Sequence, residues 1–383
     1  QISLCVPRHG KGMERLVQTL CKQGHLHQAL HILSHHCGTH LSDATYLCLL
    51  KACNTIPRTR SRGNHGHGNS TVAQELTHRI YAHIQNHRSK PSFNGSPLGD
   101  YLVMSLARCG SMESALGIFG SLSERSVFSW TAIITAYSDS CTKSDNALAL
   151  RMYDCMVMDN VWPNGFTFVA LFRACTCLRD LMHGQTFHVQ AHEQGLVSDN
   201  AFVCNALITM YGKCGAIIEA EKIFYISMVP TQRDIVSWTA MLSAYVDDDL
   251  VEEALHLYMH MMEENCSAKP DRAMLSMALV ACRMLAEKSM TTIHSSSKGK
   301  MCLEIGRALH SHAHQEGFSS DPFVQTNLVS MYAECGSILD AESVFLVLTQ
   351  RDPVAWTAML AAYVWQCEGH KALQLYERIR IEK

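Results

Sequence analysis

The sequence lacks the charge and hydropathy patterns of several large protein classes. Its 32 Lys and Arg are outnumbered by 35 Asp and Glu, giving a net charge of −3 with His neutral. Such a chain is not a polycation, which argues against sequence-independent binding to nucleic acid phosphates but leaves open a local basic groove. No apolar run reaches the roughly 18 residues that a membrane-spanning helix requires, so we expect no membrane partner.

Catalytic and metal-binding patterns are also missing. The chain has no Gly-rich phosphate loop of the Walker type and no Ser-His-Asp signature. Zinc sites need clustered Cys and His, but residues 175–177 form C-x-C and there is no C-x-x-C. His310, His312 and His314 alternate along a predicted helix, where neighbours in the string point about 200° apart and do not face one ion. We therefore predict no cofactor, no metal and no enzymatic activity.

Cysteine is abundant but shows no disulfide framework. The 17 Cys are odd in number and scattered over a long chain. Three of them, Cys109, Cys214 and Cys335, recur at one position, each before a Gly. We interpret them as small buried thiols in a reducing compartment.

The chain is organised around residues 235–271, which read as two short amphipathic helices. In the first, Trp238, Met241, Leu242 and Tyr245 fall at i, i+3, i+4 and i+7, which makes one apolar stripe. Three consecutive Asp at 247–249 interrupt the pattern, a second stripe follows, and the Pro of Lys-Pro-Asp at 269–271 ends the unit. A hairpin of this size cannot bury both stripes alone, so it needs similar neighbours.

The unit recurs. Trp130, Trp238 and Trp356 begin similar segments 108 and 118 residues apart, which is about three helical repeats of 34–40 residues. Two other unit types lie between successive Trp units, a long one and a short one. The sequence predicts an all-α, right-handed superhelical solenoid of antiparallel helix-pair repeats. The ten predicted units are 1–42, 43–95, 96–126, 127–164, 165–200, 201–234, 235–271, 272–321, 322–352 and 353–383.

The two parts of the chain differ in regularity. Residues 1–126 are degenerate repeats with an insertion at about 56–71, rich in Arg, Gly and His, which favours a flexible loop; a basic arm that touches RNA is the alternative. Residues 127–383 form a regular array that we expect to be truncated at the C-terminus, because the last unit stops before its closing turn. A second insertion, at 287–301, is also predicted to be a loop.

The alternation of three unit types resembles the P, L and S motifs of plant pentatricopeptide repeat proteins of the PLS class. The matching strings are DIVSWTAMLSAYVDDDLVEEALHLY with its KPD end, NAFVCNALITMYGKCGAIIEAEKIF and GRALHSHAHQEGF. A tetratricopeptide array, the nearest competitor, would show W-x₂-L-G-x₂-Y, but Leu242 stands where that pattern needs Gly.

The resemblance implies single-stranded RNA binding with one base per repeat. In such arrays the fifth and last residues of a unit read a base edge, and the second residue stacks between bases. The implied pairs are Thr131 with Asn164 for adenine, Asn205 with Asp234 for uracil, Thr239 with Asp271 for guanine, and Thr326 with Asp352 for guanine. The implied stacking residues are Phe128, Phe202, Val236 and Phe323. The long units offer Val169 with Asn200 and Ser276 with Asp321, to which we assign no base, and Asp100 and Ser126 are atypical of base-reading residues.

The resemblance also implies a cellular role. It points to recognition of a site in an organellar transcript, in mitochondrion or chloroplast, for RNA editing or processing, with a deaminase or other editing factors acting in trans. His314-Gln315-Glu316 fits the H-x-E of cytidine deaminases by letter, but no C-x-x-C follows, so we read it as coincidence. Because the chain starts at Gln1, we expect its true N-terminus, with any targeting peptide, to be missing.

Three alternatives stay open. Any single pair has a simpler interpretation, since Thr239 can satisfy a helix N-terminus and Asp234 can be an N-cap. The whole array can be a protein-interaction scaffold, similar to tetratricopeptide repeats, that binds peptides. The chain can also be a decayed fragment with no function.

Overall fold

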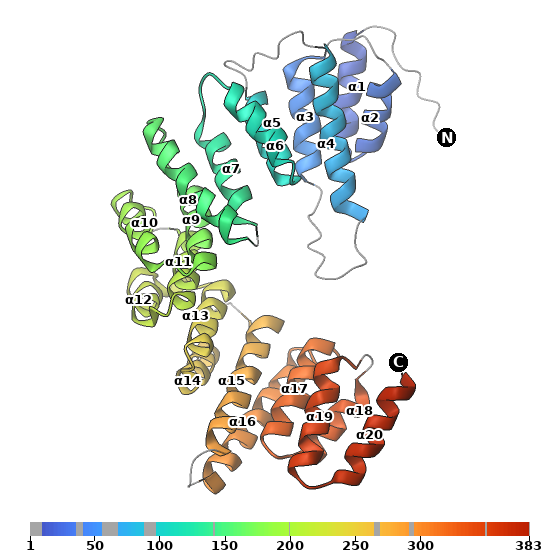
Figure 1. Ribbon diagram of the computed structural model, residues 1–383, viewed down its shortest axis with the longest axis vertical. Coiled ribbons are helices and arrows are strands. Elements are labelled where there is room, and N and C mark those ends of the chain that lie inside the picture. Colours follow the sequence, from blue (N-terminus) through green and yellow to red (C-terminus); the bar gives the residue numbers. More distant parts are fainter. Residues whose placement is uncertain are drawn as a thin grey trace. The chain divides into compact units, whose positions relative to one another are not determined.

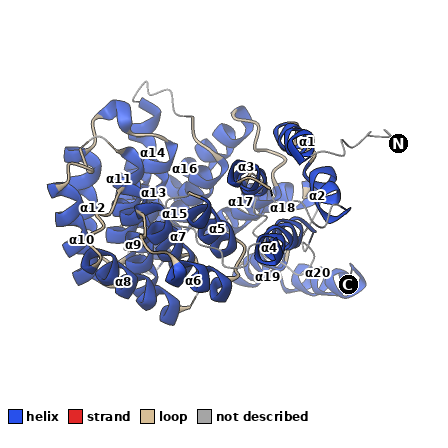
Figure 2. Cartoon of the chain, turned by 90° about the horizontal axis from the view of Figure 1, so that it is seen from above, coloured by secondary structure: helices blue, strands red, loops and turns tan. Residues whose placement is uncertain are grey.

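The computed structural model describes residues 10–35, 41–55, 68–87, 97–140, 142–198, 200–263, 269–290, 295–348 and 351–382. All regular structure in these ranges is helical, and they contain no strand (Figure 2). None of the described helices combines the length and the apolar character that a membrane span requires.

The chain divides into two compact halves between residues 178 and 179. The first half contains α1 (Gly10–Lys22), α2 (Leu26–His35), α3 (Asp43–Asn54), α4 (Gly68–His87), α5 (Leu98–Arg108), α6 (Met112–Ser121), α7 (Val127–Ser138), α8 (Lys143–Met158) and α9 (Gly165–Leu178). The predicted division after residue 126 stays a prediction.

The second half begins with α10 and ends with α20. It contains α10 (Leu181–Glu193), α11 (Ala201–Lys213), α12 (Ile217–Lys222), the π-helix η1 (Ile223–Ser227), the 3₁₀-helix η2 (Pro230–Gln232), α13 (Ile235–Asp247), α14 (Val251–Glu263), α15 (Arg272–Met290), α16 (Ser295–Gln315), α17 (Pro322–Glu334), α18 (Ile338–Val347), α19 (Pro353–Trp365) and α20 (Gly369–Glu382).

Within each half the helices form two rows. Odd-numbered helices pack against the next odd-numbered helix, as α5, α7 and α9 do in the first half and α11, α13, α15, α17 and α19 in the second (Figure 1). Even-numbered helices such as α14, α16 and α18 pack against their own odd-numbered partner. This arrangement confirms the predicted all-α solenoid of helix pairs, in which each hairpin buries its stripes against its neighbours.

Five odd-numbered helices from α7 to α19 begin at side chains that cap them in the same way. Ser126, Asn200, Asp234, Asp321 and Asp352 each accept a hydrogen bond from a backbone N–H two or three residues ahead. Such caps stabilise a helix by about 1 kcal/mol because they satisfy N–H groups that have no partner inside the helix. The closing residue of one unit therefore fixes where the first helix of the next unit starts.

The three Trp units share one packing arrangement. Trp130, Trp238 and Trp356 each lie edge-to-face against a Phe of the preceding short unit, with ring centroids 4.7, 4.9 and 4.9 Å apart. An Arg lies over the same Phe; Arg233, which is buried, donates from Nε to the Phe224 carbonyl at 3.1 Å. This Phe–Arg–Trp arrangement, with Phe119 and Arg125 in the first copy and Phe345 and Arg351 in the third, joins each short unit to the Trp unit that follows.

The two predicted insertions have different outcomes. The loop prediction for 287–301 is wrong over most of its length, because α15 continues to Met290 and α16 starts at Ser295. The insertion there lengthens two helices that pack against each other. The insertion at 56–71 lies outside the described residues up to residue 67, and α4 begins at Gly68.

Most of the thiols in the described ranges are covered. Cys21, Cys53, Cys175, Cys204, Cys282 and Cys302 are buried, and the three that precede Gly are half-buried. Cys155, Cys177 and Cys367 are exposed, so the prediction of buried thiols does not extend to them.

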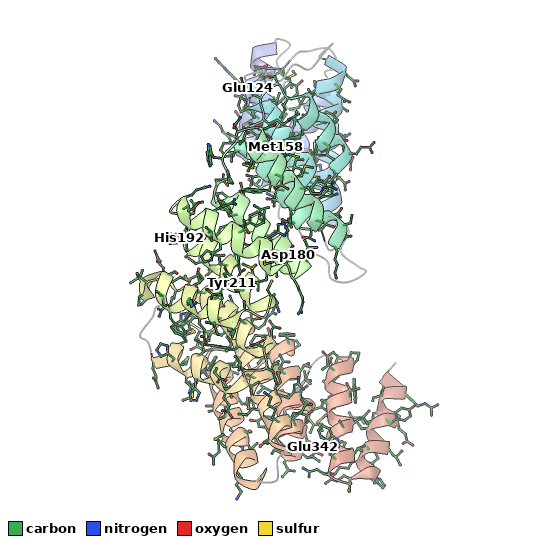
Figure 3. The ribbon with its side chains drawn as sticks, turned by 60° about the vertical axis from the view of Figure 1, so that its left-hand side comes forward. Glu124, Met158, Asp180, His192, Tyr211 and Glu342 are labelled. Atoms are coloured by element: carbon green, nitrogen blue, oxygen red, sulfur yellow. The ribbon has the colours of Figure 1, made fainter. Side chains whose placement is uncertain are left out.

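Two His–Tyr hydrogen bonds connect the second helix of a long unit to the first helix of the following short unit. His188 Nδ1 lies 2.8 Å from the hydroxyl of Tyr211, a residue labelled in Figure 3, and His310 Nδ1 lies 2.9 Å from that of Tyr332. Burial lowers the pKa of both His residues below the ordinary value of 6.5. Neighbouring His residues lower the pKa further, whereas Glu219 opposes the shift at His188 and Asp340 at His310.

These lowered pKa values predict that stability falls at mildly acidic pH. As the pH drops below about 6.5, the unfolded chain takes up protons at His188 and His310 before the folded chain does, so unfolding becomes more favourable. We expect the melting temperature to decrease between pH 7 and pH 5.5, and to decrease less in a double variant, His188→Gln with His310→Gln. The exposed His256→Gln is the control. An equal pH dependence in wild type and double variant would contradict this explanation.

Candidate nucleic-acid interface

Six of the odd-numbered helices between α7 and α19 expose a large apolar side chain at their second position. The predicted stacking residues Phe128, Phe202, Val236 and Phe323 are 68%, 51%, 55% and 57% exposed. Phe166 of α9 and Val354 of α19 occupy the same position and are also exposed. A large apolar side chain left in water at the same point of successive repeats suits the stacking of flat aromatic ligands.

The predicted pair Asn205 and Asp234 comes together in the structure. Asn205 is on α11 and is 8% exposed, and its Nδ2 donates to Asp234 Oδ1 at 3.2 Å. Ser237, which the sequence reasoning did not single out, lies between them. Its Oγ is 2.6 Å from Asn205 Oδ1 and 2.9 Å from Asp234 Oδ1, and its backbone N–H donates to the same carboxylate oxygen at 2.8 Å.

The pair Thr131 and Asn164 is connected through an intermediate residue. Thr131 Oγ1 lies 2.7 Å from Thr167 Oγ1, and Thr167 Oγ1 donates to Asn164 Oδ1 at 3.1 Å. Thr167 stands at the same place in α9 as Ser237 in α13, the third residue of the helix. Its backbone N–H also donates to Asn164 Oδ1, at 3.0 Å.

Asp100 and Ser126, which look atypical in the sequence, form the same kind of contact. Ser126 Oγ donates to Asp100 Oδ2 at 2.7 Å while it caps α7. The side-chain arrangement of the regular repeats therefore extends into the part of the chain that reads as degenerate.

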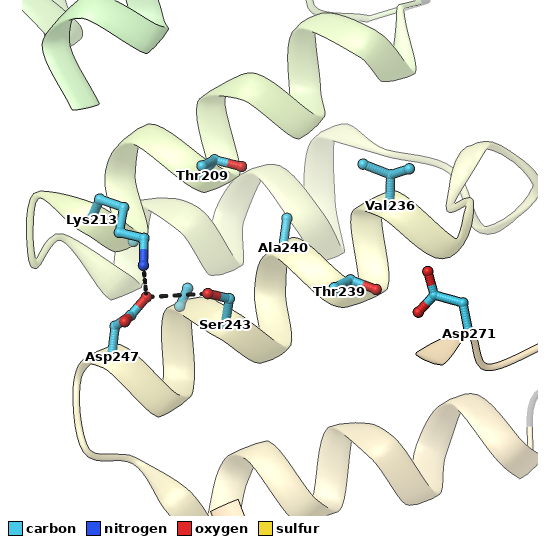
Figure 4. A pocket seen from close by; sticks show the side chains of 10 residues that line it. Thr209, Lys213, Val236, Thr239, Ala240, Ser243, Asp247 and Asp271 are labelled. Carbon is cyan, nitrogen blue, oxygen red and sulfur yellow. Dashed lines mark hydrogen bonds and ion pairs between the residues drawn. The ribbon is translucent and has the colours of Figure 1, made fainter. Parts of the chain in front are cut away.

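Thr239 and Asp271 face an open space and are not hydrogen bonded to each other. Both residues line a hollow of about 300 Å³ between α11 and α13 (Figure 4). Thr239 Oγ1 donates to the Ile235 carbonyl at 2.7 Å, and Asp271 Oδ1 accepts from the N–H of Met274 at 2.8 Å. The far end of the hollow is lined by Lys213 and Asp247, which form a 2.5 Å ion pair.

The remaining pairs are held separately. Thr326 is buried in α17, and Asp352 caps α19 by accepting from Ala355 N at 2.8 Å. In the long unit, Ser276 is buried and its hydroxyl has no hydrogen-bond partner among the described residues. Asp321 caps α17 and lies 3.4 Å from Arg272.

Capping uses one oxygen of the closing Asp residues. Asp234, Asp271 and Asp352 each direct Oδ1 to a backbone N–H of the following helix, so the simple interpretation as N-caps is correct for all three. A carboxylate has a second oxygen that still accepts hydrogen bonds. Capping thus leaves an acceptor for a ligand, and in the unit 201–234 the closing residue also contacts the fifth residue.

Two cations on this row of helices are paired with acids. Lys213 pairs with Asp247, and Arg173 pairs with Asp139. The described residues hold no group of three or more His, Cys, Asp or Glu arranged to bind a metal ion. His310 and His312 of the alternating His string instead contact Tyr332 and Tyr258 on different helices.

Comparisons with known proteins fit this geometry. The family model described as "PPR repeat" matches residues 202–226, 236–266 and 354–382, which correspond to three of the helix pairs. A chloroplastic pentatricopeptide repeat-containing protein of Arabidopsis thaliana is 31% identical over 79% of this chain and 32% of its own length. A mitochondrial one is 31% identical over 76% of this chain and 39% of its own length.

A third Arabidopsis relative, the chloroplastic pentatricopeptide repeat-containing protein CRR2, is 27% identical over 95% of this chain and 50% of its own length. The chain therefore spans between about a third and a half of the length of these relatives. Among solved structures, the pentatricopeptide repeat protein PPR10 in complex with an 18-nt psaJ RNA element aligns with a TM-score of 0.64, covering 99% of this chain and 56% of that chain at 13% identity. This likeness establishes the shared fold.

Proposed function

We propose that this chain, which contains PPR repeats, binds single-stranded RNA and reads one base per repeat along its odd-numbered helices. The observation that carries the proposal is the arrangement around Asn205 and Asp234. The fifth and last residues of one repeat meet beside the exposed Phe202 and Val236. A base stacked between these apolar side chains presents its polar edge to the amide and the carboxylate, which is how single-stranded RNA is commonly recognised.

The paired cations support sequence-dependent rather than charge-driven binding. With Lys213 and Arg173 held by carboxylates, these two cations are expected to add little phosphate attraction. Contacts to base edges and stacking then make the larger contribution. A chain of this kind selects a site and leaves the chemistry to another protein or domain.

The cellular role that we propose is recognition of a site in an organellar transcript for editing or processing, as a PLS-class protein. Its support is the Trp, long and short unit order together with relatives named chloroplastic and mitochondrial. An editing deaminase is the kind of partner that this role requires.

The direct test is binding to short RNAs at fixed salt. We expect wild-type protein to bind a single-stranded RNA containing A-N-U-G-N-G, read 5′ to 3′ from residue 127 to 352, more tightly than a scrambled RNA of the same composition. The same sequence in a duplex is expected to bind weakly, because its bases are stacked and paired. Equal affinity for matched and scrambled RNA would contradict base reading.

One observation favours the second candidate function, peptide binding. The even-numbered helices α14 and α16 border an apolar hollow of about 500 Å³, lined among others by Leu255, Met259, Met262, Ile305 and Leu309. This hollow belongs to the second helices of the repeats, away from the readout pairs. If this chain binds peptides in the hollow and shows no preference among RNAs, it is a protein-interaction scaffold.

A further inference from the structure

We propose that Ser237 and Thr167, the third residues of α13 and α9, are positioning residues that set which hydrogen-bonding group each readout pair offers to a base. The inference rests on the proposed function, since it gives these hydroxyls a role only where the pairs read RNA. Both side chains are fully buried, with 0% exposure. They therefore act through the pair and do not touch the RNA.

The hydrogen bonds around Asn205 admit one orientation of its amide. A carboxylate only accepts hydrogen bonds, so the atom of Asn205 that lies 3.2 Å from Asp234 Oδ1 is the Nδ2 donor. The amide oxygen then faces Ser237 Oγ at 2.6 Å and shares the single hydroxyl proton with Asp234 Oδ1, which is 2.9 Å from the same hydroxyl. Ser237 thus binds the amide oxygen of Asn205, to which the carboxylate of Asp234 cannot donate a hydrogen bond.

This network leaves defined groups for a ligand. In the described part of the chain, the hydrogen bonds to Asp234 all end on Oδ1, which leaves Oδ2 as an acceptor. The Nδ2 group of Asn205 has two protons and uses one for Asp234. The pair therefore offers one donor and one acceptor in a fixed order.

A fixed order of donor and acceptor distinguishes pyrimidines. At ring positions 4 and 3, uracil presents an acceptor and then a donor, whereas cytosine presents a donor and then an acceptor. One fixed pair of protein groups complements only one of the two bases in the same stacked position. If the Asn205 amide were free to turn, its oxygen would replace the donor and the distinction would weaken.

Other repeats in the same chain support the assignment. Thr167 makes the equivalent contacts to Thr131 and Asn164. In α15 and α19 the third residue is Met274 or Ala355, which lack a hydroxyl. Neither the pair of Thr239 and Asp271 nor that of Thr326 and Asp352 is joined by a hydrogen bond in the described residues. The two pairs of the regular array that are joined by hydrogen bonds are therefore those whose following unit has a hydroxyl at its third position.

The experiment compares two RNAs that contain A-N-U-G-N-G or A-N-C-G-N-G and are otherwise identical. Their affinities are measured with wild type, Ser237→Ala, Ser237→Thr and Ser243→Ala at one salt concentration. We expect the uracil-to-cytosine affinity ratio to fall about two- to tenfold in Ser237→Ala, the loss of one buried hydrogen bond. Ser237→Thr keeps the hydroxyl, as Thr167 does, and should keep the ratio. Ser243, on the same helix, contacts Asp247 and lines the hollow beside Thr239 and Asp271, so its variant should keep the wild-type uracil-to-cytosine ratio at the third base.

The outcomes separate the inference from the proposed function. If wild type does not distinguish uracil from cytosine, the pair of Asn205 and Asp234 does not read a base and the proposed function fails at this repeat. If wild type distinguishes them and Ser237→Ala keeps the same ratio, including by binding both RNAs equally more weakly, Ser237 has only a structural role and the inference is overturned. Melting curves of each variant show whether the fold is retained.

Discussion

Replacing Trp238 with Ala is expected to lower the free energy of unfolding by about 3–5 kcal/mol, the range found for buried aromatic side chains. Trp238 is fully buried, and its ring lies edge-to-face on Phe224 with centroids 4.9 Å apart. The substitution leaves a cavity where a short unit meets a Trp unit. Because repeat arrays are stabilised by contacts between neighbours, we expect the loss to be concentrated in the helices around this junction.

The measurement combines chemical denaturation, followed by circular dichroism, with hydrogen exchange of the amides in α11 to α15. Trp238→Phe is the matched control, because it keeps an aromatic edge against Phe224. It also removes an indole N–H that is buried without a partner among the described residues, so its cost should be much smaller. A loss below about 1 kcal/mol in Trp238→Ala would show that the Phe–Arg–Trp arrangement does not stabilise the junction.

The fold was predictable because its signals are local and repeated. The stripe of Trp238, Met241, Leu242 and Tyr245 is wholly buried, as its helical spacing indicates. The closing Asp residues cap the following helices, as their composition also indicates. The insertion at 287–301 differs from the predicted loop because its Gly, Ser and Thr weaken helix propensity, whereas packing between α15 and α16 favours helix.

The candidate site was only partly predictable for a different reason. Spacing identifies Asn205 and Asp234 as the fifth and last residues of one unit, but their 3.2 Å contact depends on how two helices stack. Ser237 carries a weak sequence signal, because a Ser early in a helix usually helps to cap it. Its second role, toward the amide of another repeat, is visible only in three dimensions.

Replacing Asn205 with Thr, while Asp234 is kept, is expected to move the preference at the third base from uracil toward guanine. The variant creates the combination of Thr and Asp that occurs naturally as Thr239 with Asp271. A wrong pairing at one base edge is expected to cost about 1–3 kcal/mol, by analogy with base readout in DNA, which corresponds to roughly 5- to 150-fold in affinity.

The structure indicates that the Asn205→Thr variant keeps the wild-type fold. Thr239 shows how a Thr at this position satisfies its hydroxyl, by donating to the carbonyl four residues earlier at 2.7 Å. Ser237 would lose the Asn205 oxygen but keep Asp234 Oδ1 at 2.9 Å as acceptor. Asp234 would still cap α13 through Ser237 N. The melting temperature of the variant should therefore stay close to that of wild type.

The measurement is a two-by-two comparison of wild type and Asn205→Thr with the uracil and guanine forms of one RNA at fixed salt. A change in a phosphate contact would weaken both RNAs alike, whereas a change in base readout reverses their order. If both proteins bind the two RNAs equally, or if neither RNA is bound above a scrambled control, Asn205 does not read a base. The apolar hollow between α14 and α16 would then become the better candidate for the binding surface of this chain, with a peptide as its ligand.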